Sequence, residues 1–103
     1  MNHAELQALL AGLFRLWQVP AKVNADRTVT DAVAARIEPE GRAPLTVVWQ
    51  KAPFGIVWQV KPEGRRVRTY PSVNGMIRDL RERLVPERGS ARVLFAGKAG
   101  DAP

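Results

Sequence analysis

The sequence predicts an α+β domain: an antiparallel four-stranded meander with two helices packed on one face, in the order α-β-β-β-β-α-β. Apolar residues recur at helical spacing near the start of the chain and again after its middle. The stretch between them alternates apolar and polar residues, and three Pro/Gly turns divide it. Separate helical and strand-like runs of this kind favour helices covering one face of an antiparallel sheet.

The first helix is expected over residues 2–17. Asn2 is a suitable N-cap, and Glu5 can complete a capping box with it. Pro20 requires the helix to end by that point. The expected apolar stripe, which should pack on the sheet, consists of Leu6, Leu9, Leu10, Leu13, Leu16 and Trp17.

The first strand is expected over residues 29–37, after a polar break over residues 22–27. Val29, Val33 and Ile37 alternate with polar or small residues, which is typical of a strand with one buried face. The same three residues are also four apart, so a short helix starting at Thr30 is the competing interpretation. The β-branched content and the turn that follows favour the strand.

Three turns define the meander. Residues 38–42 read Glu-Pro-Glu-Gly-Arg, and residues 61–65 repeat them as Lys-Pro-Glu-Gly-Arg. Proline presets φ and glycine accepts a positive φ, so both segments indicate hairpin turns. A third turn over residues 51–55 joins two runs that share the triplet Val-Trp-Gln. The segments between and after these turns are the second, third and fourth predicted strands.

The pattern also predicts the register, because a slip of one residue would turn every side chain to the other face. Placing Trp49 opposite Trp58 gives one apolar face, the predicted core, made of Val33, Ala35, Ile37, Leu45, Val47, Trp49, Ile56, Trp58 and Val60. The opposite face is polar and basic, with Arg36, Thr46, Val48, Gln50, Val57, Gln59, Arg66, Arg68 and Tyr70.

The second helix is expected over residues 73–85, with Ser72 as its N-cap and Pro86 ending it. Its apolar stripe is Val73, Ile77, Leu80 and Leu84. Its solvated side carries two charge pairs at i,i+4 spacing, Arg78 with Glu82 and Asp79 with Arg83. Residues 92–96 are a candidate fifth, C-terminal strand at an edge of the sheet, which gives a single domain over residues 1–96 and a flexible tail over 97–103.

The residue inventory argues against an enzyme. The chain has no cysteine, so thiolate chemistry and cysteine-ligated metals are excluded, and His3 is its single histidine. The carboxylates lie in turns or beside arginines, which suits solvated or paired groups. We therefore expect no catalytic residue, no cofactor and no metal, although a pocket with a desolvated carboxylate would revive a catalytic reading. The chain shows neither a signal peptide nor a membrane span, so a cytoplasmic protein is expected.

The net charge of +6 is the feature that points to a partner. A GC-rich coding bias is one explanation, since Arg outnumbers Lys by 12 to 4. The excess is nevertheless uneven: residues 1–51 hold 6 bases and 5 acids, and residues 52–103 hold 10 bases and 5 acids. Arginines on phosphates and an aromatic ring under a base would bind nucleic acid. The candidate residues are Arg65, Arg66, Arg68, Tyr70, Arg78 and Arg81.

Two other interpretations remain open. The strand arginines can instead serve as edge charges that prevent pairing with another chain. Alternatively, the domain is a protein-interaction or self-associating adaptor that uses the exposed sheet face or an edge strand. The candidates for that role are Val48 and Val57, apolar residues on the predicted open face, and Phe54 in a turn.

Overall fold

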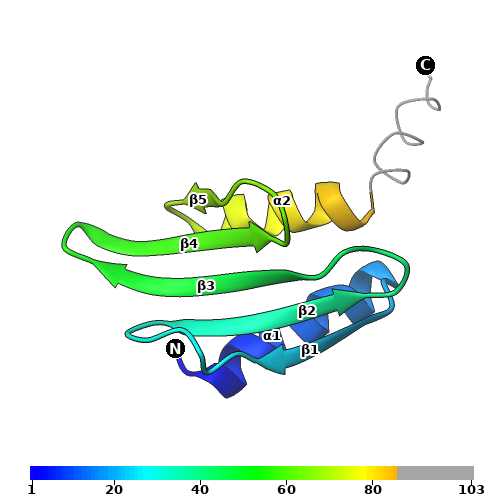
Figure 1. Cartoon of the computed structure of the whole chain (residues 1–103), viewed down its shortest axis with the longest axis horizontal. Coiled ribbons are helices and arrows are strands. Elements are labelled where there is room, and N and C mark those ends of the chain that lie inside the picture. The colour runs from blue at the N-terminus through cyan, green and yellow to red at the C-terminus, as the bar shows by residue number, and fades with distance from the viewer. Residues whose placement is uncertain (86–103) are drawn as a thin grey trace, which may run out of the picture.

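The computed structural model describes residues 1–85 and shows two helices and a five-stranded antiparallel sheet (Figure 1). Strands that follow one another in the chain are neighbours in the sheet, so the predicted α+β meander is confirmed. The elements are α1 (His3–Trp17), β1 (Ala21–Ala25), β2 (Val33–Pro39), β3 (Leu45–Ala52), β4 (Gly55–Pro62), β5 (Arg68–Tyr70) and α2 (Val73–Leu84).

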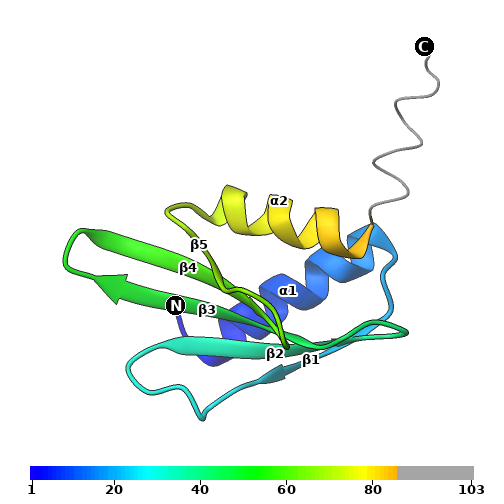
Figure 2. The same ribbon diagram turned by 45° about the horizontal axis from the view of Figure 1, so that its top comes forward.

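Both helices lie on the same face of the sheet, as expected (Figure 2). Helix α1 packs on β1 and β2, and helix α2 packs on β4 and β5. The central strand β3 completes the core between them through Leu45 and Val47. The sheet therefore has a covered face and an open face, and each of its edges is paired with one helix.

The caps of both helices agree with the sequence. The Asn2 side chain accepts a hydrogen bond from the Glu5 amide at 2.8 Å, and the Glu5 carboxylate accepts one from the Asn2 amide at 2.8 Å. Helix α1 ends at Gln18, which adopts a left-handed conformation with φ 59°. The Ser72 hydroxyl accepts a hydrogen bond from the Gly75 amide at 3.1 Å and begins α2.

The residues that the two helices bury differ in part from the predicted apolar stripes. Leu16 was expected on the α1 stripe but is 75% exposed, whereas Phe14, which was not expected there, is 2% exposed. At 100° per residue, Leu16 points well away from the line through Leu6, Leu10 and Phe14. In α2, Met76 takes a fully buried place beside the predicted stripe.

The predicted register is confirmed. Trp49 pairs with Trp58 across β3 and β4, and Val33 pairs with Trp49 across β2 and β3. Residues directly opposite one another share a face, so the alternating apolar residues of all three strands meet under the helices. Ile56 is the exception: it was expected in the core but is 37% exposed, beside the β3–β4 turn. The buried core of the described residues contains Leu6, Leu10, Phe14, Ala35, Ile37, Leu45, Val47, Trp58, Val60, Met76, Leu80 and Leu84.

The expected polar break is wrong in part, because residues 21–25 form strand β1. Val23 pairs with Ile37, and Ala25 pairs with Ala35, which adds β1 to the edge of the sheet under α1. The strand was missed because a single valine is its only bulky apolar residue. The strand predicted over residues 29–37 begins only at Val33, so the competing helix at Thr30 is also excluded. The candidate strand 92–96 and the tail 97–103 lie outside the described residues.

Both Pro-Glu-Gly-Arg turns adopt the same backbone. Gly41 and Gly64 each have φ 73°, a conformation that glycine adopts without steric cost. The Arg42 amide donates to the Pro39 carbonyl at 3.4 Å, and the Arg65 amide donates to the Pro62 carbonyl at 3.2 Å. The turns lie at the same end of the sheet, because one complete hairpin separates them (Figure 1).

Candidate functional site

The predicted basic strand is shorter than expected, and the side chains of Arg68 and Tyr70 lie on the opposite face of the sheet from the predicted one. Strand β5 contains three residues and starts at Arg68, so Arg65 and Arg66 precede it. Tyr70 pairs with Trp58, and Arg68 pairs with Val60. Because opposite residues share a face, both side chains lie on the helix side of the sheet. The expectation that Arg66, Arg68 and Tyr70 alternate on the open face is therefore wrong.

Tyr70 is the last residue of β5, and its side chain contacts α2. Its hydroxyl donates a hydrogen bond to one carboxylate oxygen of Asp79, and the Arg83 side chain donates to the other. Its ring also lies against Gly75, where an added Cβ would stand 3.0 Å from Cδ1 of Tyr70. Burial, followed by the hydrogen bond to Asp79, raises the pKa of Tyr70 above 10.0. The half-buried ring therefore lies against α2 and not on the open face of the sheet.

Asp79 was expected on the solvated side of the second helix, but it is 7% exposed. The predicted pair with Arg83 is confirmed as an ion pair. What the helical spacing alone did not show is that Tyr70 approaches the same carboxylate from β5. We call Tyr70, Asp79 and Arg83 the polar clamp, because they fasten the edge strand to the helix.

Five exposed arginines lie in the chain segments that follow β4. They occupy the β4–β5 loop, β5 and α2, and these elements lie together at one edge of the sheet (Figure 1). We call this part of the chain, residues 65–85, the β5–α2 edge. Within residues 1–85, none of the five has a side-chain hydrogen bond or ion pair, and Arg78 does not form the predicted pair with Glu82. The five are Arg65, Arg66, Arg68, Arg78 and Arg81.

A groove of about 270 Å³ opens at the end of this edge, where the two Pro-Glu-Gly-Arg turns meet the last turn of α2. We call it the turn groove. Its charged lining residues are Arg42, Arg65, Arg83 and Glu63, and its walls include Leu45 and Leu84.

Two of the four charged groups in the turn groove are already matched by partners. The Glu63 carboxylate forms an ion pair with the Arg36 guanidinium at 3.4 Å, and Arg83 forms one with Asp79. The Arg42 side chain donates to the backbone carbonyl of Arg83 at 3.2 Å, and the Arg65 side chain has no hydrogen bond or ion pair among residues 1–85. Arg42 and Arg65 thus remain without a carboxylate.

Arg42 was not among the predicted site residues. The signal that identifies it is the repeated turn, because Arg42 and Arg65 occupy the same position in the two copies. These turns join β2 to β3 and β4 to β5, and alternate turns of a meander fall at the same end of the sheet.

The residues predicted for protein contact are distributed differently. Val48 lies on the open face but is only 1% exposed, between Ala34 and Gln59 on the neighbouring strands. It cannot serve as an exposed contact, because β3 is the central strand and is flanked on both sides. Val57 is half-buried, whereas Phe54 at the tip of the β3–β4 hairpin is 78% exposed.

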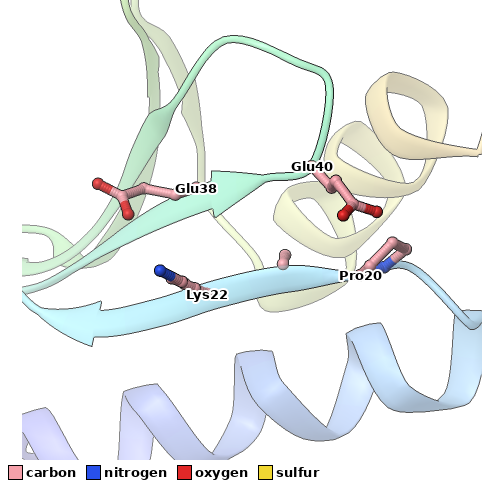
Figure 3. Close-up of a pocket in the computed structure, with 5 residues that line it drawn as sticks. Pro20, Lys22, Glu38 and Glu40 are labelled. Carbon is pink, nitrogen blue, oxygen red and sulfur yellow. The ribbon is translucent and has the colours of Figure 1, made fainter.

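A second, shallow groove of about 390 Å³ lies over β1 and β2 (Figure 3). Glu38 and Glu40 line it, but their carboxylates point in different directions, and Glu38 is bound to Arg36 at 3.2 Å. Lys22 lies directly opposite Glu38 in the sheet. Among residues 1–85, no group of three or more His, Cys, Asp or Glu side chains is placed to hold a metal ion.

None of the helices formed by residues 1–85 has both the length and the apolar character needed to span a membrane. No protein-family model, curated protein or solved structure matches this chain.

Proposed function

We propose that this chain is a binding module that holds nucleic acid by its phosphate backbone along the β5–α2 edge. The observation that carries the proposal is the set of exposed arginines there whose side chains form no hydrogen bond or ion pair within residues 1–85. Exposed cations without intramolecular partners can neutralise phosphates and release condensed counterions. The five contacts are Arg65, Arg66, Arg68, Arg78 and Arg81.

Binding would depend on charge rather than on base stacking. Tyr70, the single tyrosine of the chain, is engaged in the polar clamp, and no other aromatic residue lies among residues 65–85. Phosphate contacts carry little sequence information. The proposal therefore includes weak discrimination between sequences of equal length, and it accords with the cytoplasmic location that the sequence favours.

The polar clamp also favours binding over catalysis. Asp79 is the buried carboxylate of the described residues, and its two oxygens are occupied by Tyr70 and Arg83. A general base needs a carboxylate that can reach a substrate. We accordingly propose a protein without enzymatic activity.

A salt series with a fluorescently labelled oligonucleotide tests the proposal. The logarithm of the association constant should fall linearly with the logarithm of salt concentration, as expected for counterion release. Single replacements Arg68→Gln and Arg78→Gln should each reduce the slope by roughly one unit. Absence of binding at low salt, or a slope that neither replacement changes, would contradict the proposal.

A second candidate function rests on the hairpin tip. Phe54 is 78% exposed and Ile56, two residues on, is 37% exposed, so apolar surface faces solvent there. This surface favours contact with a protein, in the simplest case a second copy of the chain. Light scattering across a concentration series should then show a dimer that Phe54→Ser abolishes, with Leu16→Ser, at a 75% exposed site on α1, as the control. A monomer at every concentration rules out self-association.

A further inference from the structure

We propose that the turn groove binds the terminal phosphate monoester of a nucleic-acid strand. The inference rests on the proposed function for the strand itself, but the groove is a distinct place with its own residue, Arg42. Arg42 and Arg65 come from different turns and line one groove, although they lie 23 positions apart in the sequence.

Charge balance in the turn groove favours an added anion. The Glu63 carboxylate is drawn to Arg36, and the Arg83 guanidinium is drawn to Asp79. Each of these pairs is formed within the described chain. Arg42 and Arg65 line the same groove and form no ion pair with its carboxylate, Glu63. Guanidinium groups bind phosphate through paired charge-assisted hydrogen bonds, so two of them form a suitable site for one phosphate.

The backbone of both arginines, and the side chain of Arg42, are positioned before a ligand arrives. Each arginine follows a glycine with φ 73° in a hydrogen-bonded turn, and Arg42 is further fixed by its bond to the Arg83 carbonyl at 3.2 Å. Such preorganisation lowers the entropy lost on binding.

The size and the place of the cavity point to the end of a strand. The groove, with a volume of about 270 Å³, has room for a phosphate group but not for a duplex. Arg65 lines the groove and is followed at once by Arg66 and Arg68 of the β5–α2 edge, so a strand lying along that edge can end in the groove. A terminal monoester carries nearly two negative charges at neutral pH, whereas an internal phosphodiester carries one.

The test compares three labelled oligonucleotides of identical sequence, ending in a 5′ phosphate, a 3′ phosphate or hydroxyl groups only. We expect one of the two phosphorylated strands to bind on the order of tenfold more tightly than the hydroxyl-ended strand. The variant Arg42→Gln should remove this preference and leave the affinity for the hydroxyl-ended strand unchanged. Arg42→Lys should keep part of the preference, and the control Arg15→Gln, on α1, should keep all of it.

A calorimetric titration with a nucleoside monophosphate makes failure of this inference distinguishable from failure of the proposed function. Equal affinity for all three strand ends overturns the terminal-phosphate site, even if the salt-dependent binding to strands is confirmed. Binding of the monophosphate that Arg42→Gln abolishes supports the groove, even if longer strands do not bind along the edge. Loss of end preference in Arg15→Gln as well as in Arg42→Gln would overturn the assignment to the groove.

Discussion

The two edges of the sheet are built alike and closed differently. Each consists of an edge strand and a helix with a side-chain N-cap, and both helices bury an apolar stripe on the same face. At the α1–β1 edge, the Gln7 amide donates to the Val23 carbonyl at 2.8 Å. At the β5–α2 edge, the charged polar clamp joins the strand to the helix. The comparison shows how one edge is closed by a neutral contact and the other by ionised groups.

The bond from Gln7 closes an edge that would otherwise be open to another strand. The backbone amide of Glu40 donates to the Pro20 carbonyl at 3.0 Å, and the backbone amide of Asp26 donates to the Ala34 carbonyl at 2.9 Å. In an antiparallel pair the bonded residues alternate, so the backbone of Val23 points away from β2. Gln7 satisfies the carbonyl at this point and obstructs the addition of a further strand.

The two edges also differ in their number of charged residues. Residues 1–25 contain two bases and one acid, whereas residues 61–85 contain seven bases and three acids. At the β5–α2 edge, Asp79 neutralises only Arg83, and five further arginines are left facing solvent without a described partner. The polar clamp thus joins the strand and the helix that carry these arginines, and it does not neutralise the charges of the five.

Breaking the polar clamp should have the largest effect on stability. Replacing Asp79 with Ala leaves the Tyr70 hydroxyl and the half-buried Arg83 guanidinium without their acceptor. We expect the free energy of unfolding to fall by about 3 kcal/mol, as measured by urea denaturation. Asp79→Asn keeps an acceptor and should cost less. If the two variants lose the same stability as Glu82→Ala, on the exposed side of α2, the clamp does not fasten this edge.

Alkaline pH should loosen the same edge. The pKa of Tyr70 is raised in the folded protein, so the folded state holds the proton more tightly than the unfolded state. Its contribution is fully present below pH 10 and is lost as the pH rises through the folded pKa. Because Tyr70 is the single tyrosine, its ultraviolet absorbance reports its ionisation directly. The free energy of unfolding should fall above pH 10 in the native chain and more weakly in Tyr70→Phe; equal losses would contradict this account.

Opening the α1–β1 edge should have a smaller effect. Gln7→Ala removes one neutral hydrogen bond to a backbone carbonyl and should cost about 1 kcal/mol in the free energy of unfolding. Asn74→Ala, at an exposed position on α2, provides the control and should cost less. A Gln7 variant as stable as the native chain would show that this contact does not secure the edge.

The sequence was sufficient to predict the central hairpins, because two periodic signals agreed there. Alternation placed Trp49 opposite Trp58, and the Pro/Gly turns required the reversals on either side. The helix caps were predictable for a similar reason, since a cap depends on residues within one turn of the chain.

The two edge strands were less predictable. Strand β1 has the single large apolar residue Val23, so its pattern resembles a loop until α1 covers it. Strand β5 begins after a turn and two irregular residues, which changes the face on which Arg68 and Tyr70 lie. The buried environment of Asp79 depends on Tyr70 from another element, a contact that helical spacing cannot contain. The turn groove likewise requires the meander to bring Arg42 beside Arg65.

The most direct test of the proposed function compares charge-matched variants of the two edges. Arg66→Gln with Arg68→Gln removes two arginines from the β5–α2 edge, and Arg15→Gln with Arg27→Gln removes two exposed arginines without a described partner from outside it. Salt titration of oligonucleotide binding should give a slope reduced by roughly two units in the first double variant and an unchanged slope in the second. Equal reductions in both would contradict the account, because binding would then follow net charge rather than the β5–α2 edge.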